Sequence, residues 1–156
     1  MEIRDTSPAD AAEMAELLNA IIAIGGTTAH QEPKTPDQVR QGYIDGPGVR
    51  TSVLACEGGR VIGWQSIEHW EGGFHIGSFV RPGIQARGVG AAMFARTLAQ
   101  ARAAGIPEII ASIRADNVPG LAFYAKMGFR DFAQDPDFAL KDGRVVGRVH
   151  RKLSLV

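Results

Sequence analysis

The stretch that most constrains this chain is residues 77–105, GSFVRPGIQARGVGAAMFARTLAQARAAG, where a short apolar run leads through a glycine-rich turn into an amphipathic pattern. The apolar run closes at Pro82, and the pattern predicts a helix over residues 91–104. Gly88 and Gly90 have no Cβ, so the backbone amides beside them can approach a ligand closely. The helix adds its own unpaired N–H groups and the positive end of its dipole. The sequence therefore predicts an anion site here, most suited to phosphate.

Two familiar phosphate-binding motifs do not fit this turn. A P-loop ends in Gly-Lys-Ser/Thr, and that ending is absent. A dinucleotide-binding GxGxxG follows its strand closely, whereas here Met93 takes the third glycine position and Gly88 lies eight residues past Val80. A strand-to-helix turn that binds no ligand is the structural alternative.

The pattern Gln85-x-x-Gly88-x-Gly90, between a strand and a helix, resembles the acyl-CoA-binding segment of the GNAT superfamily of N-acyltransferases. A second segment strengthens the resemblance, because Asn117 precedes a predicted helix that bears Tyr124 and ends in Lys-Met-Gly-Phe. The two segments occur in the order typical of the family, with a helix and a strand between them. The resemblance covers residues 53–129.

The resemblance implies that acetyl-CoA is the cosubstrate. No metal is expected, because the histidines show no metal-ligand spacing. The pyrophosphate of acetyl-CoA is expected on the loop amides and its pantetheine along the preceding strand. The residues implied to contact acetyl-CoA are Ser78, Phe79, Val80, Gln85, Ala86, Arg87, Gly88, Val89, Gly90, Ala91 and Asn117.

The implied reaction is direct attack of a primary amine on the thioester, in a complex that holds both substrates. Tyr124 is expected to protonate or hydrogen-bond the departing thiolate. The amine must first lose a proton, since free alkyl amines have pKa values near roughly 10. His75 is the candidate base because imidazole titrates near neutral pH, and Glu68, Glu71 or water are the alternatives. The competing interpretations are a core aromatic for Tyr124 and a strand-end histidine for His75.

Within the superfamily, the N-terminal half resembles the phosphinothricin acetyltransferase branch. The cues are Ala-Ile and Thr-Thr-Ala segments ahead of Glu32-Pro33, and Gly143-Arg144 before a late strand. That branch usually has His in place of Tyr124 and Glu in place of His75. Both departures fall on the expected chemistry, so the acceptor is predicted only as a small-molecule amine, such as an amino acid or amino-acid analogue.

The order of predicted elements indicates a mixed α+β fold. Strands are predicted at residues 1–4, 52–57, 60–68, 75–80, 108–113, 129–132 and 144–153, and helices up to residue 24 and at 35–43, 91–104 and 118–126. Three successive strands favour an antiparallel meander, and the helical crossover favours a parallel pair at strands four and five. The resemblance adds that this pair is splayed, in a central sheet of about seven strands flanked by about four helices. No repeat or linker interrupts residues 1–156, so a single domain is expected.

Composition excludes several other classes of protein. Lys and Arg total 17 and Asp and Glu total 17, so no basic field predicts a nucleic-acid partner. No apolar run approaches the roughly 20 residues that cross a bilayer, and no signal peptide begins the sequence, so a cytoplasmic location is expected. Cys56 is the only cysteine. The four histidines show no metal-ligand spacing.

Two other functions remain open from the sequence, as does the choice between monomer and homodimer. A non-catalytic acyl-CoA sensor or interaction module would use the same fold, because fold does not determine function. A protein or peptide N-acetyltransferase would need a peptide groove, for which the sequence gives no sign.

Overall fold

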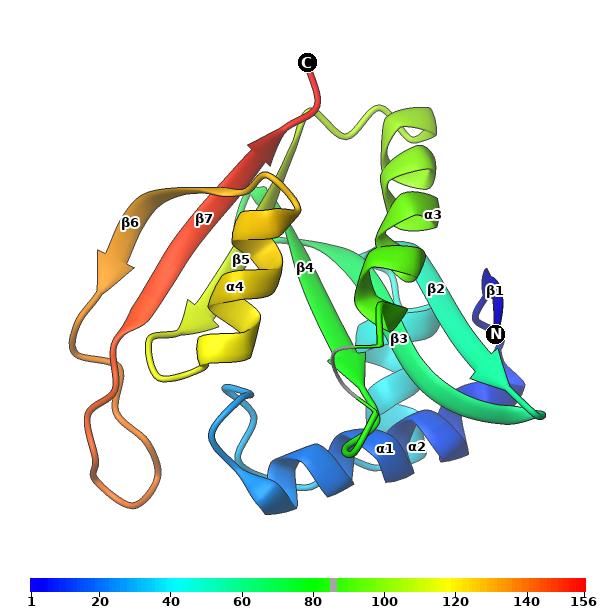
Figure 1. Cartoon of the computed structure of the whole chain (residues 1–156), viewed down its shortest axis with the longest axis horizontal. Helices are drawn as coiled ribbons and strands as arrows, with labels where there is room; N and C mark the ends of the chain where they lie inside the picture. The colour runs from blue at the N-terminus through cyan, green and yellow to red at the C-terminus, as the bar shows by residue number, and fades with distance from the viewer. Residues whose placement is uncertain (85–86) are drawn as a thin grey trace.

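A mixed sheet of seven strands organises residues 1–84 and 87–156, which are the residues that this computed structural model describes (Figure 1). The order of strands across the sheet is β1-β2-β3-β4-β5-β7-β6. The strands are β1 Glu2–Asp5, β2 Val49–Glu57, β3 Arg60–Trp70, β4 Gly73–Val80, β5 Glu108–Arg114, β6 Arg130–Asp135 and β7 Arg148–Ser154. The helices are α1 Ala11–Ile24, α2 Pro36–Val39, α3 Val89–Ala103 and α4 Val118–Lys126; a single turn Pro8–Asp10 precedes α1, and a π-helical turn η2, Arg40–Ile44, continues α2.

Helices cover both faces of the sheet. On one face, called the α1 face, Leu54, Trp64 and Phe79 pack with the buried side of α1. On the other, called the α3 face, residues such as Ile67 and Ile76 pack with α3 and α4. Because successive side chains of a strand point to opposite faces, the two faces carry different parts of the site. The predicted fold class is confirmed.

β4 and β5 are the only parallel neighbours in the described sheet, and they are joined at one paired position, His75 with Ile110. β5 pairs with β7 over its whole length instead. Beyond His75 the two strands separate toward their carboxyl ends, at the side of the sheet where α3 and α4 begin. The predicted parallel and splayed pair is therefore confirmed.

The last strand is shorter than the sequence indicated. It was predicted over residues 144–153, but β7 begins at Arg148. Residues 138–146 pair among themselves within the β6–β7 connection, where Leu140 N–H donates to Arg144 O at 2.7 Å and Val146 N–H donates to Phe138 O at 2.8 Å. Residues 144–146 therefore belong to this local hairpin and not to the sheet.

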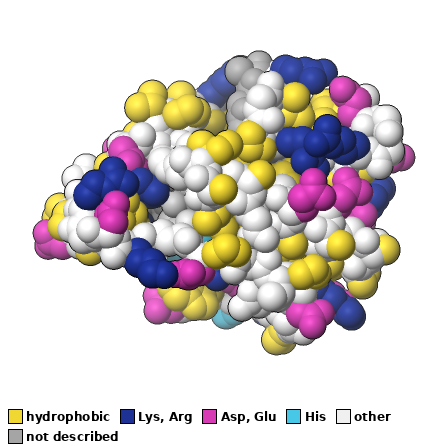
Figure 2. All heavy atoms as spheres, turned by 90° about the horizontal axis from the view of Figure 1, so that it is seen from below, with side chains coloured by type: hydrophobic (Ala, Val, Ile, Leu, Met, Phe, Trp, Pro, Cys, Tyr) yellow, Lys and Arg dark blue, Asp and Glu magenta, His cyan; other side chains and the backbone are white. Residues whose placement is uncertain are grey.

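Charges of both signs are mixed on the face of the molecule seen in Figure 2, and neither sign forms a continuous field there. Attraction of a charged ligand therefore depends on individual side chains and their surroundings. In the described part of the chain, no helix is long and apolar enough to cross a membrane. Among the same residues, no three His, Cys, Asp or Glu side chains gather as a metal site.

Candidate functional site

The N-terminus of α3 has backbone amides that no side chain of the described residues caps. Gly88 is the N-cap residue and adopts a left-handed conformation with φ of 80°, and within residues 1–84 and 87–156 no side chain accepts a hydrogen bond from the first turn. A Cβ at Gly88 would meet nothing within 4 Å, so the backbone there is open to a ligand. Arg87 directs its guanidinium to Glu57 at 3.3 Å. The start of this 15-residue helix thus suits an anion such as a pyrophosphate. Gln85 and Ala86 lie outside the described residues.

Gly90 has a structural reason of its own to be glycine. A Cβ at this position would lie 2.8 Å from Cε1 of Phe123, so the first turn of α3 packs directly against α4. Beneath that turn, the fully buried Gln65 of β3 places Nε2 3.5 Å from Gly90 O. Its Oε1 has no hydrogen-bond partner in the described part of the molecule. Sequence reasoning missed Gln65, although a polar residue inside an apolar run is a visible signal.

Tyr124 lies where β4 separates from β5. Its hydroxyl donates to Ser78 Oγ at 3.0 Å, and its ring packs edge-on against Phe123 and Phe129. The side chain is buried, and burial raises the pKa of the phenol to about 12 even though the bond to Ser78 opposes that shift. The hydroxyl therefore stays protonated at neutral pH and is held at a fixed point on β4.

Asn117 has a capping role in the fold. Its Oδ1 accepts from Gly120 N–H at 3.0 Å at the start of α4, and its Nδ2 donates to Thr27 O at 2.9 Å. The side chain thus connects α4 to the loop that follows α1. Contact between Asn117 and acetyl-CoA stays a prediction.

His75 and Glu68 face each other across β4 and β3, where they form a register pair. Nε2 of His75 lies 3.1 Å from Trp70 O, and the two rings meet edge-on at 5.4 Å. By strand alternation both side chains lie on the α1 face, as Phe79 does. Glu71 is exposed at the β3–β4 turn, with φ of 47°. Of the three candidate bases, His75 and Glu68 are adjacent and Glu71 projects from the end of the hairpin.

A cavity of about 250 Å³ opens on the α1 face beside Glu68. The residues that line it are His30, Lys34, Gln38, Gly42, Tyr43 and Glu68. They come from the connection between α1 and α2, from α2 and η2, and from β3. Lys34 and Tyr43 were not predicted.

His30 and Tyr43 form one wall of this cavity. His30 Nε2 lies 2.5 Å from Tyr43 Oη, and Tyr43 in turn packs edge-on against Trp64 and Phe79. Burial, helped by the charge of Lys34, lowers the pKa of His30. Burial, helped by the charge of Glu68, raises the pKa of Tyr43. Both groups are therefore neutral at neutral pH.

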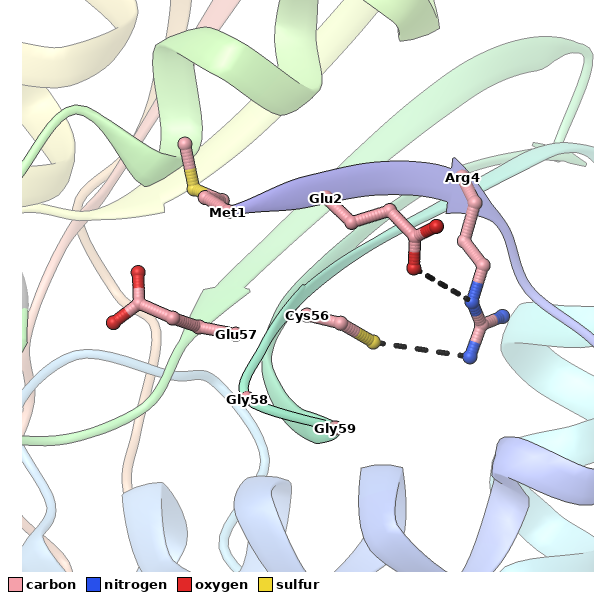
Figure 3. A pocket seen from close by; sticks show the side chains of 7 residues that line it. All are labelled: Met1, Glu2, Arg4, Cys56, Glu57, Gly58 and Gly59. Atoms are coloured by element: carbon pink, nitrogen blue, oxygen red, sulfur yellow. Dashed lines mark hydrogen bonds and ion pairs between the residues drawn. The ribbon is translucent and has the colours of Figure 1, made fainter.

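A second cavity, of about 420 Å³, lies at the β1 edge of the sheet (Figure 3). It is bordered by β1 and by the hairpin turn at Gly58 and Gly59. Arg4 lies at its side, with Nη2 3.8 Å from Cys56 Sγ and 2.9 Å from an oxygen of Asp10. β1 is three strands away from β4 in the sheet. Among the described residues, no predicted catalytic or acetyl-CoA-binding residue lines this cavity, although Glu57, which does line it, pairs with Arg87 at 3.3 Å.

The chain is similar to known proteins both in sequence and in fold. The Acetyltransferase (GNAT) family profile matches residues 14–129. An L-methionine sulfoximine/L-methionine sulfone acetyltransferase of Pseudomonas paraeruginosa is 26% identical over 98% of this chain and 94% of its own length. The L-amino acid N-acyltransferase MnaT of Escherichia coli is 26% identical over 99% and 94%.

Among solved structures, a GNAT superfamily phosphinothricin acetyltransferase from Sinorhizobium meliloti, in complex with AcCoA, has a TM-score of 0.87. The match covers 99% of this chain and 88% of that chain at 21% identity. At this identity the likeness concerns the fold.

Proposed function

Because the chain belongs to the GNAT family of acetyltransferases, we propose that it transfers the acetyl group of acetyl-CoA to a primary amine of a small molecule, an amino acid or amino-acid analogue. The proposal depends on the contact between the expected anion site at the start of α3 and the helix that bears Tyr124. The uncapped first turn of α3 packs through Gly90 onto Phe123, the neighbour of Tyr124. An anion on α3 and a reacting thioester beside Tyr124 therefore belong to one ligand.

Acetyl-CoA supplies the activated thioester when it is bound. We assign its pyrophosphate to the amides of residues 87–91 and its pantetheine to Ser78, Phe79 and Val80, beside which β5 has separated. A backbone donor near Val80 would meet the thioester oxygen as negative charge develops on it. The open backbone at Gly88 and the lack of a side-chain cap support this placement.

Tyr124 acts on the leaving group. Thiols have pKa values near roughly 8.5, well below the pKa of about 12 of this phenol. Complete transfer of the Tyr124 proton to a thiolate is thus unfavourable. Tyr124 instead donates a hydrogen bond to the sulfur as charge builds on it, and Ser78 holds the hydroxyl in place until then.

His75 is the proposed base, and Glu68 is the group that competes with it. If Nε2–H of His75 donates to Trp70 O at 3.1 Å, Nδ1 carries the lone pair that accepts a proton from the amine. The names of the relatives support an amino acid as acceptor, since one is named for methionine sulfoximine and methionine sulfone and another for L-amino acids.

The test is thiol release from acetyl-CoA with a panel of amino acids, amino-acid analogues and simple amines. Mass spectrometry of the products identifies the acetylated amine. A protein that binds acetyl-CoA and turns over none of the panel is a non-catalytic module, and the proposed function is then wrong. Titration with acetyl-CoA alone does not separate the two, because both bind it.

A further inference from the structure

Two side chains of opposite charge line the same cavity without meeting each other. Lys34 and Glu68 are both half-buried. In the described part of the chain, neither side chain has an ion pair or a hydrogen bond. Half-buried charges usually find such partners, because removal from water has a cost that a partner offsets. The cavity therefore offers one cationic and one anionic group to a ligand that carries both charges.

Lys34 is held at the cavity by its main chain. The side-chain amide of Asn19 on α1 donates to Lys34 O at 2.9 Å and accepts from Lys34 N–H at 2.8 Å. These two hydrogen bonds fix the backbone of the loop at Lys34 and leave its ammonium group available to a ligand. Glu68 is fixed on the opposite wall, within β3.

The rings of Tyr43 and His30 line the same cavity as the two charges. Tyr43 and His30 are hydrogen-bonded to each other, and both rings pack near Phe79. Charges that approach these rings interact more strongly than they would in open water. Charge-assisted bonds to a ligand at Lys34 and Glu68 are therefore worth more than surface ion pairs.

The cavity lies on the α1 face beside β4, the strand that is expected to hold the thioester. Gly77 of β4 points to the α1 face, and a Cβ there would come 3.8 Å from Cε1 of Tyr43. Its neighbour in the chain is Ser78, which binds Tyr124 on the other face. Glu68 pairs with His75, three residues before Ser78 and thus about 10 Å along the strand at about 3.3 Å per residue.

We propose that this cavity is the acceptor subsite and that it takes a zwitterionic α-amino acid, with the carboxylate on Lys34 and the amino group at Glu68. The proposal rests on the proposed function and names the residues that select its substrate. A cavity of about 250 Å³ suits a single amino acid, being smaller than the pockets of roughly 300–1,000 Å³ that hold larger ligands. Glu68 holds the ammonium beside His75, to which the amine then gives its proton.

The experiment measures binding, so that it does not depend on turnover. Three ligands are titrated calorimetrically into the full chain with CoA present: L-methionine sulfone, the same molecule without its carboxylate (3-(methylsulfonyl)propylamine) and the same molecule without its amine (4-(methylsulfonyl)butanoate). The wild type is expected to prefer the zwitterion by roughly 10- to 100-fold, the size of one charge-assisted hydrogen bond. Equal binding of the three overturns the proposal.

Variants assign each charge. Lys34→Gln should abolish the preference over the carboxylate-free amine and keep the preference over the amine-free acid, and Glu68→Gln should do the reverse. Lys126→Gln, an exposed lysine on α4, is the matched control and should change neither. A uniform loss of affinity for all three ligands in both variants contradicts the assignment. If a variant fails to fold, the ligand series on the wild type still decides.

The outcomes also separate this proposal from the proposed function. A preference for the zwitterion without acetyl transfer keeps the subsite and removes the activity. Acetyl transfer that uses the carboxylate-free amine as well as the amino acid keeps the activity and removes the subsite.

Discussion

Tyr124 of α4 donates its hydroxyl to Ser78 of β4 at 3.0 Å, across the place where β4 has lost β5 as a neighbour. One hydrogen bond thus fixes a protonated phenol at the strand that is expected to hold the thioester. Packing against Phe123 and Phe129 is compatible with this role, because the ring is buried and only the hydroxyl reaches β4. The packing and catalytic interpretations of Tyr124 differ in what loss of the hydroxyl does.

Tyr124→Phe keeps the ring and removes the hydroxyl. Turnover should fall by about 10- to 1,000-fold, as an order of magnitude for a lost proton donor, while affinity for acetyl-CoA stays within a small factor. Steady-state kinetics and calorimetry measure the two effects. Ser78→Ala, which leaves the phenol in place, should reduce turnover less. Unchanged turnover in Tyr124→Phe would mean that Tyr124 only packs.

Gly88→Asp and Gly88→Asn test the anion site as a matched pair. Both side chains tolerate the left-handed conformation better than most, and they differ in charge. Gly88→Asp should bind acetyl-CoA roughly 10-fold or more weakly than Gly88→Asn, because the carboxylate opposes the phosphate. The gap should narrow at high salt. Equal affinities would remove this turn from the site. Gly90→Asp is a poorer test, since its Cβ would collide with Phe123.

His75→Ala tests the base. Loss of turnover should be greatest near neutral pH, where little of the amine is already deprotonated, and the variant should recover toward the wild type as pH approaches the amine pKa of roughly 10. A pH–rate profile of both proteins with one amine of known pKa measures this. Parallel profiles would exclude His75. Glu68→Gln, measured alongside, shows whether the cross-strand partner takes the proton instead.

His30 predicts a pH dependence of stability. Burial lowers its pKa in the fold, so the unfolded chain binds the proton more readily. The stability that neutral His30 contributes is complete above its unfolded pKa of about 6.5 and is lost as pH falls through the lower folded value. Denaturant unfolding at pH 7.5 and 5.5 should show a smaller difference for His30→Gln than for the wild type. His150→Gln is the comparison, because the pKa of His150 is also lowered but its side chain is less buried. If the free energy of unfolding of His30→Gln changed between the two pH values as much as that of the wild type, the prediction would be wrong.

Gly42→Leu tests the size of the acceptor cavity. Gly42 lines it, and a Cβ there meets nothing within 4 Å, so the fold should tolerate the change. KM should rise for methionine sulfone by roughly 10-fold or more, in line with the discrimination that one or two methylenes give, and less for glycine. Gly42→Ala is the near-silent control. Equal effects on both amino acids would place the substrate side chain elsewhere.

Local sequence predicted the parts of the site that a few adjacent residues create. The turn at Gly88 and the helix that bears Tyr124 followed from glycine and from the signals at the helix ends, and the parallel pair of strands followed from the helical crossover between them. The cavity did not, because Lys34 reaches it through Asn19, fifteen residues away, and meets Glu68 from a strand much later in the chain. The early start predicted for the last strand has the same cause, since the local sequence at residues 144–146 does not show that they pair with residues 138–140 and not with the sheet.

Because β4 and β5 pair only at His75 and Ile110, the sheet consists of two halves, β1–β4 and β5–β7–β6, which α3 connects along the chain. Heat or denaturant should separate the two halves between β4 and β5 before either half unfolds. A ligand that binds between β4 and β5 would connect the two halves, and its binding would raise the free energy of unfolding of the whole sheet. Amide hydrogen exchange along β4 and β5, with and without the cosubstrate, measures this stabilisation as increased protection of the backbone amides.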